Sequence, residues 1–178
     1  MTESTLPLTW SDDALSARAF ALATALKLQG LRMATAESCS GGWIAKLCTD
    51  LAGSSVWFEC GWITYSNRAK TQQLGVQPGT LARFGAVSEA VAAEMAAGAQ
   101  HHANADLALS VTGVAGPSGG SPDKPVGTVC FAWVGSDQQP ETETQWYSID
   151  AEGERAREWI RRATAAHAMD GLLARMHA

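Results

Sequence analysis

The sequence has little charge, no long apolar run and no paired cysteine motif. Charged residues make up 17% of the 178 residues, below the roughly 25% usual in soluble domains. The 13 basic and 18 acidic side chains leave a formal net charge of -5, and the pI is about 5.3. No run of Lys or Arg is longer than the pair Arg161 and Arg162. A nucleic acid is therefore not expected as a partner, because its phosphates call for a basic patch, whereas a small anion is compatible with this charge.

Membrane, metal and disulfide signals are also missing. No stretch approaches about 18 uninterrupted apolar residues, and the first residues have neither the basic region nor the apolar core of a signal peptide. We therefore expect a cytoplasmic protein with no membrane partner. Cys39, Cys48, Cys60 and Cys130 form no C-x-x-C pair, and the four His residues complete no zinc pattern. We expect free thiols, no metal and no cofactor.

Alternating helical and strand patterns predict one α/β domain. Helices are expected between residues 11 and 30 and at 43–51, 67–74, 88–103 and 154–176; strands are expected at 32–36, 56–65, 106–111, 127–134 and 142–148. The continuous apolar run at 106–111 is typical of a strand buried on both faces, and the adjacent last two strands indicate an antiparallel part. The predicted fold is a three-layer α/β/α domain with a mixed, mostly parallel sheet of about five strands. Residues 1–10 are expected to be a flexible arm, and 11–178 a single domain.

Three polar turns follow predicted strands, at residues 37–42, 64–70 and 112–120. Ligands of open α/β sheets bind beyond the C-terminal ends of the strands, so these turns are expected to converge on one pocket. In the first turn, Ser38 precedes Gly41 and Gly42, which let a ligand approach the N–H groups of the next helix. The ordinary structural interpretation is that Ser38 and Ser40 only cap that helix.

The other two turns each have a functional and an ordinary interpretation. If Asn67 is the helix cap, Lys70 is the third helical residue, and its side chain leans back towards Tyr65. A lone lysine at this place is more often a solvated surface residue. The third turn has no charged residue between Thr112 and Pro122, which suits a loop that brings a ligand close to main-chain N–H groups but also suits a plain connection. It is neither a dinucleotide-binding nor a Walker loop.

Five motifs in order resemble signatures of the CinA C-terminal domain family. They are residues 36–42 (AESCSGG), 64–70 (TYSNRAK), 85–89 (GAVSE), 112–120 (TGVAGPSGG) and 124–128 (KPVGT). The resemblance covers residues 12–175 and implies a three-layer α/β/α fold with a mixed sheet. Stand-alone members of the PncC type are nicotinamide-nucleotide amidohydrolases, so it also implies deamidation of nicotinamide mononucleotide to nicotinate mononucleotide and ammonia.

The resemblance also implies roles for particular residues. The family's serine nucleophile falls on Ser38, its lysine on Lys70 and its active-site tyrosine on Tyr65. Two positions depart from the family pattern. Ser40 replaces the more usual threonine and keeps the hydroxyl. The glycine-acid-arginine motif before the last helix reads RAR at residues 155–157, so that only its arginine, Arg157, is kept.

The chemistry of a primary amide agrees with these roles. Its hydrolysis needs a nucleophile, a base and donors for the developing oxyanion. None of the three turns contains His, so Lys70 is the expected base for Ser38, and it must be neutral to act. A fall in its pKa from about 10.4 to about 7.5 by burial or by a helix N-terminus would achieve this. Tyr65 is expected to orient the amine or to relay a proton.

The predicted substrate contacts come from all three turns and the last helix. Backbone N–H groups of residues 39–41, joined by Thr112 or Gly113, are the candidate oxyanion donors. Arg157 is the candidate phosphate ligand, with Arg155 in reserve and a solvated arginine as the ordinary alternative. The full substrate-binding set is Cys39, Ser40, Gly41, Gly42, Thr112, Gly113, Gly116, Gly119, Gly120 and Arg157.

Two other functions stay open on the sequence. One is a non-catalytic pyridine-nucleotide sensor or a competence-associated partner-binding module, because the family domain also occurs fused to a second domain. The other is a cysteine hydrolase that uses Cys39, which is adjacent to Ser38 and near the same helix N-terminus. The expected partner is the small-molecule substrate, and a homo-oligomer is compatible with the sequence.

Overall fold

The computed structural model describes residues 8–135, 138–148 and 154–176 and contains one five-stranded sheet. In β2–β1–β3–β4–β5 order, β1 is parallel to β2 and β3, and β4 is antiparallel to β3 and β5. The predicted mixed sheet is therefore confirmed. The strands are β1 (Met33–Glu37), β2 (Phe58–Ile63), β3 (Leu107–Gly113), β4 (Thr128–Gly135) and β5 (Glu141–Trp146).

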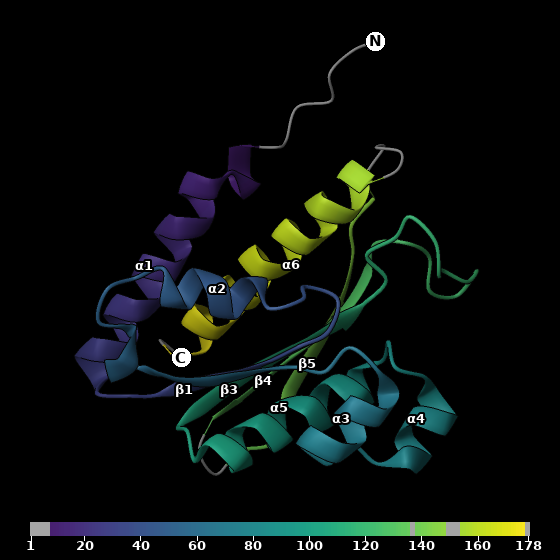
Figure 1. The fold of residues 1–178 in the computed structure, drawn as a ribbon, viewed down its shortest axis with the longest axis horizontal. Coiled ribbons are helices and arrows are strands. Elements are labelled where there is room, and N and C mark those ends of the chain that lie inside the picture. Colours follow the sequence, from purple (N-terminus) through teal and green to yellow (C-terminus); the bar gives the residue numbers. More distant parts are fainter. Residues whose placement is uncertain (1–7, 136–137, 149–153, 177–178) are drawn as a thin grey trace.

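Helices cover both faces of the sheet, which confirms the three-layer prediction (Figure 1). On one face lie α1 (Asp12–Gln29), α2 (Trp43–Thr49) and α6 (Glu154–Arg175); on the other lie α3 (Asn67–Leu74), α4 (Pro78–Phe84) and α5 (Glu89–Ala103). Each face has its own apolar core. Trp57, Phe131 and Trp133 are buried in the first, whereas the second is built from small residues of α5 and from Val91 and Met95. The central strand β3 is buried over most of its length, as its apolar run predicts.

Most helix boundaries follow their capping residues. Ser11 caps α1, and Gly30 ends it with a φ of 66°, a left-handed conformation that suits glycine. Two expectations need correction. Ser66, not Asn67, caps α3, so Lys70 is its fourth residue. Helix α4 was not expected; none of its residues is buried, so no apolar periodicity marks it.

The N-terminal arm is partly described. Residues 1–7 lie outside the described residues, and Leu8–Trp10 forms a 3-10 helix. Trp10 packs edge-on against Tyr147, with 6.2 Å between the ring centres. The arm expected at residues 1–10 is therefore anchored at its last residue, because an aromatic pair of this kind is stabilising.

The parallel strands bring the three polar turns to one edge of the sheet. Glu37 at the end of β1 pairs with Ile63 of β2 and with Val111 of β3. The pairing continues into the first two turns: the Ser38 N–H donates to the Val111 carbonyl at 3.0 Å, and the Thr64 N–H donates to the Glu37 carbonyl at 2.9 Å. The backbone at Ser38 thus extends the hydrogen-bonding pattern of the sheet.

Within the described ranges, no helix combines the length and apolarity needed to cross a membrane.

Candidate active site

Ser38 and Lys70 meet at the edge of the sheet where β1 and β2 end. Nζ of Lys70 lies 2.8 Å from Oγ of Ser38 and 2.6 Å from the carbonyl oxygen of Thr64. Because Ser66 caps α3, Lys70 is in the first turns of that helix, where a side chain leans towards the helix N-terminus and reaches the end of β2. The two catalytic candidates are therefore within hydrogen-bonding distance of each other.

The amine of Lys70 is in an environment that favours its neutral form. The side chain is only 1% exposed, and burial lowers the pKa of Lys70 to about 8. Desolvation disfavours the ammonium form because water no longer solvates the charge. Since about 8 is close to neutral pH, a usable fraction of Lys70 is the free amine, which can accept the hydroxyl proton of Ser38.

Cys39 is in a poor environment for a thiolate. Its side chain is buried, and desolvation raises the pKa of Cys39 to about 12; the carboxylate of Glu37 adds to this rise. A thiol with this pKa is protonated near pH 7 and is a weak nucleophile. The environment therefore argues against the cysteine hydrolase interpretation. Cys39, Cys48, Cys60 and Cys130 are all free thiols.

The turn after Ser38 is built around the carboxylate of Glu37, which is fully buried. It accepts hydrogen bonds from the N–H groups of Ile44 (3.1 Å) and Ala45 (2.8 Å) and from the hydroxyl of Ser40 (2.7 Å). Burial raises the pKa of Glu37, while these donated bonds oppose the rise. The N–H groups of Ile44 and Ala45, in the first turn of α2, are thus bound by the protein itself. Neither Ser38 nor Ser40 caps α2, whose N-cap is Gly42.

The backbone N–H groups of the turn divide into engaged and available ones. Those of Ser38 and Gly41 are engaged, since they donate to the carbonyls of Val111 (3.0 Å) and Ser38 (3.2 Å). Among the described residues, no oxygen accepts from the N–H groups of Cys39 and Ser40. Both N–H groups interact with the sulfur of Cys39, and Ser40 is fully buried, so Cys39 is the member of the expected donor set that lines the cavity with Ser38.

Arg157 and Tyr65 form a second pair at the same site. Nη1 of Arg157 donates to the carbonyl of Gly116 at 2.7 Å, and Nη2 donates to the hydroxyl of Tyr65 at 3.1 Å. The Tyr65 side chain is 66% exposed, and its hydroxyl is held by Arg157 instead of the Lys70 amine. Arg157 thereby connects α6 to the turns after β2 and β3.

A cavity of about 170 Å³ joins these groups. Thr112 and Gly113 line it from the end of β3, where the Thr112 hydroxyl donates to the Ala86 carbonyl at 2.8 Å. The full lining is Ser38, Cys39, Tyr65, Lys70, Ala86, Val87, Thr112, Gly113, Ala115 and Arg157. The three catalytic candidates and seven other residues therefore face one space, and they come from all three turns, from the segment before α5 and from α6.

Several predicted contacts do not line this cavity. Ser40 bonds to Glu37, and Gly116 is present only through its carbonyl bond to Arg157. Gly119 and Gly120 are exposed in the loop beyond. Gly41 and Gly42 line a separate cavity of about 430 Å³, together with Trp43 and the arginines Arg161 and Arg162. Arg155 is exposed.

Three contributions were missed from the sequence. Ala86 and Val87 line the cavity from the segment before α5, inside the GAVSE motif at 85–89, whose sequence alone indicates no role. Glu37 organises the turn, and an acidic residue at the end of an apolar strand is the signal that could have shown it. Arg161 contacts Ser40; nothing in its local sequence indicates that contact.

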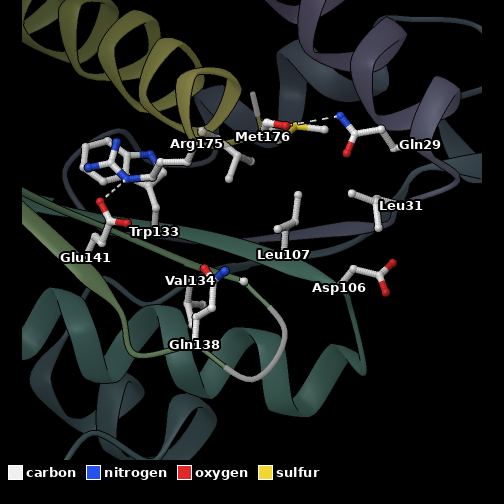
Figure 2. A pocket seen from close by; sticks show the side chains of 12 residues that line it. Gln29, Leu31, Asp106, Leu107, Trp133, Val134, Gln138, Glu141, Arg175 and Met176 are labelled. Atoms are coloured by element: carbon white, nitrogen blue, oxygen red, sulfur yellow. Dashed lines mark hydrogen bonds and ion pairs between the residues drawn. The ribbon is translucent and has the colours of Figure 1, made fainter. Parts of the chain in front are cut away.

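A further cavity lies at the opposite edge of the sheet, where β3 begins and β4 ends, and different residue types line it. This cavity of about 250 Å³ lies between the start of β3 at Leu107 and the end of β4 at Val134. Figure 2 shows Arg175 over Trp133 and paired with Glu141 on one side of it. The described residues that line this cavity include no serine, cysteine or lysine. The residues that line this cavity therefore offer no alternative to Ser38 as the nucleophile.

Among the described residues no group of three or more His, Cys, Asp or Glu is arranged to hold a metal ion.

Comparison with known protein families places this site in context. The model of the CinA C-terminal domain matches residues 16–176. The chain belongs to the CinA C-terminal domain family. This confirms the resemblance seen in the five sequence motifs.

Individual CinA-domain proteins match over most of their length. The chain is 51% identical over 148 residues to the nicotinamide-nucleotide amidohydrolase PncC of Escherichia coli strain K12, covering 83% of this chain and 86% of that protein. It is 45% identical over 161 residues to the protein of the same name from Pseudomonas putida, covering 90% and 96%. A crystal structure of the competence/damage inducible protein CihA from Agrobacterium tumefaciens superposes with a TM-score of 0.86 at 39% identity, covering 98% of this chain and 99% of that one. These matches confirm the three-layer fold.

Proposed function

We propose that this protein is a nicotinamide-nucleotide amidohydrolase that converts nicotinamide mononucleotide and water into nicotinate mononucleotide and ammonia. The observation that carries the proposal is the 2.8 Å contact between the Lys70 amine and the Ser38 hydroxyl inside a cavity. Relatives with this named activity, at 51% and 45% identity over most of the chain, support the substrate.

The first half of the reaction forms an ester on Ser38. The neutral amine of Lys70 accepts the hydroxyl proton while Oγ attacks the carboxamide carbon. The carbonyl oxygen becomes an oxyanion, for which the N–H group of Cys39, in the turn that lines the cavity, is the candidate donor. As the C–N bond breaks, the Lys70 ammonium returns the proton to the leaving nitrogen, and ammonia departs.

The second half uses the same residues on water. Lys70, neutral again, takes a proton from a water molecule, whose oxygen attacks the ester carbon. The second oxyanion accepts from the same donor, and Oγ leaves with the proton from Lys70. The product is nicotinate mononucleotide, and the enzyme returns to its starting state. A single amine can serve both halves because its pKa of about 8 lets it bind and release a proton near neutral pH.

The phosphate of the nucleotide needs a cation to bind it. The position of Arg157 in the site supports this residue as the phosphate ligand. It lines the same cavity as Ser38, and its guanidinium bonds to a carbonyl and a phenol, neither of which neutralises its charge. An arginine offers parallel N–H groups to a phosphate. We expect the exposed ring of Tyr65, whose hydroxyl accepts from Arg157, to contact the bound nucleotide.

Ammonia release tests the proposal directly. Purified protein is incubated with nicotinamide mononucleotide in the presence of a metal chelator, and ammonia and nicotinate mononucleotide are measured together. The proposal predicts both products in equal amounts. A non-catalytic sensor would bind the nucleotide, measured by calorimetry, and release neither product.

A further inference from the structure

Arg161 contacts the turn that carries Ser38, although it is 121 positions from Ser40 in the chain. Its Nε and Nη2 donate to the carbonyl oxygen of Ser40 at 3.0 and 2.8 Å. The guanidinium also lies over the ring of Trp43, 4.9 Å from its centre, and a Cβ on Gly41 would come within 3.1 Å of Nη2. The side chain is therefore fitted closely against the turn and the start of α2.

The two adjacent arginines of α6 both lie over the ring of Trp43 but have different hydrogen-bond acceptors. Arg162 forms ion pairs with Asp12 and Glu158. In the described part of the chain, the hydrogen-bond acceptor of Arg161 is the Ser40 carbonyl. Hydrogen bonds from a charged donor are roughly twice as strong as neutral ones. The charged guanidinium of Arg161 thus binds one backbone carbonyl, that of Ser40, two residues after Ser38.

Ser40 is consequently held at two atoms, by a residue three positions before it and by one 121 positions after it. Its hydroxyl donates to the carboxylate of Glu37, and its carbonyl accepts from Arg161. Ser40 itself is fully buried and does not line the catalytic cavity, whereas Ser38 and Cys39, which precede it, do. With both the side chain and the carbonyl of Ser40 restrained, the peptide units on either side have little freedom to rotate.

We infer that Arg161 is a positioning residue for the deamidation: by holding the Ser40 carbonyl it fixes the turn at 38–41, which carries the Ser38 hydroxyl and the Cys39 N–H. The inference rests on the proposed function, since it concerns the rate of that reaction. Arg161 is not among the described residues that line the cavity of Ser38 and Lys70, and it lines the separate cavity of about 430 Å³. Its effect is therefore expected on the chemical step and not on the binding of the nucleotide.

The expected loss follows from the cost of a displaced oxyanion donor. Replacing Arg161 with Ala should lower kcat about 100-fold, the size of a misplacement of roughly 1 Å or the loss of one donor. The KM for nicotinamide mononucleotide should stay close to that of the wild type. If Arg161 held the phosphate instead, KM would rise and kcat would be preserved.

Chemical rescue separates positioning from a general structural role. The cavity of about 430 Å³ beside Arg161 gives a free guanidinium ion room to enter the Arg161→Ala protein and bond to the Ser40 carbonyl. Millimolar guanidinium chloride, far below denaturing concentrations, should raise kcat of this variant, whereas sodium chloride at the same ionic strength should not. Arg175→Gln removes a guanidinium from the same helix at the opposite edge of the sheet and is the control.

The experiment measures ammonia release against nucleotide concentration for wild type, Arg161→Ala, Arg161→Lys and Arg175→Gln, with thermal unfolding of each. The expected result is a kcat loss in both Arg161 variants, guanidinium rescue of Arg161→Ala alone, and wild-type kinetics for Arg175→Gln. A kcat near wild type in Arg161→Ala, a loss confined to KM, or no rescue would overturn the inference. If Arg161→Ala does not fold, a wild-type kcat in Arg161→Lys would overturn it equally. A wild-type protein that releases no ammonia contradicts the proposed function instead.

Discussion

The amine of Lys70 lies 2.8 Å from the hydroxyl of Ser38, from which it is separated by 32 positions in the chain. Parallel pairing of β1 and β2 places the turn after each strand at the same edge of the sheet. The start of α3 then directs Lys70 back to the end of β1. The burial that brings the two groups together also lowers the pKa of Lys70 to about 8. The same strand pairing that brings Lys70 to Ser38 therefore also buries its amine and favours the neutral form that can act as a base.

The rate should depend on pH through Lys70. The neutral amine is the active form, so kcat/KM should rise with pH and level off above the pKa of about 8. The measurement is the initial rate of ammonia release at low nucleotide concentration between about pH 6 and pH 9.5. Lys70→Arg should be inactive throughout this range, because arginine stays protonated. A flat profile, with chemistry shown to be rate-limiting, would rule out a neutral-lysine base.

The stability of the protein should also depend on pH through Lys70. Its pKa falls from 10.5 to about 8 on folding, so between these values the unfolded chain holds more protons and the wild type becomes more stable as pH rises. The comparison is with Lys70→Met, in which this group does not titrate. From about pH 7 to pH 10, the unfolding free energy of the wild type should increase relative to the variant by about 2 to 3 kcal/mol, measured by urea denaturation. An unchanged difference would mean that the pKa of Lys70 is not lowered.

The main features of the fold could be predicted because they depend on local patterns. Ser11 and Gly30 mark the ends of α1, and the apolar run at 106–111 marks a strand covered on both sides. Ser66 and Asn67 are both good N-cap residues, so the sequence did not distinguish them. Helix α4 was missed because a helix with no buried side chain leaves no apolar stripe.

The candidate site was less predictable where it depends on contacts between distant elements. Ser38 and Lys70 could be placed near each other because parallel strands end at one edge. The carboxylate of Glu37 accepts from the N–H groups of Ile44 and Ala45 in the first turn of α2, which sequence spacing alone did not show. The contact of Arg161 with Ser40 depends on how α6 packs beside the turn.

Glu37 should be needed for the stability of the turn. Glu37→Gln leaves one acceptor oxygen for the N–H groups of Ile44 and Ala45 and the Ser40 hydroxyl, and it turns an amide N–H towards donors. The expected loss is about 1.5 to 3 kcal/mol of unfolding free energy, the size of a hydrogen bond to a buried charge. Glu59→Gln, which removes a surface partner of Arg32, is the control and should cost less than about 1 kcal/mol. Equal losses in the two variants would contradict the role given to Glu37.

Arg157 should contribute mainly through the phosphate. Arg157→Ala should cost about 1.5 to 3 kcal/mol in kcat/KM with nicotinamide mononucleotide, the size of a charged hydrogen bond. With nicotinamide riboside, which lacks the phosphate, the ratio of variant to wild type should be close to one. Comparable losses on both substrates would show instead that the bonds of Arg157 to Gly116 and Tyr65 support the site itself. The phosphate role would then pass to Arg155 or to the loop at 113–120.

The most direct test of Ser38 as the nucleophile activated by Lys70 is a pair of adjacent substitutions assayed with nicotinamide mononucleotide. Ser38→Ala removes the hydroxyl that contacts Lys70, while Cys39→Ala removes a buried thiol whose pKa is raised to about 12. Ammonia and nicotinate mononucleotide are measured at equal concentrations of folded protein, with folding checked by circular dichroism. The prediction is no turnover above background for Ser38→Ala and most of the wild-type rate for Cys39→Ala. An active Ser38→Ala protein together with an inactive Cys39→Ala protein would contradict it.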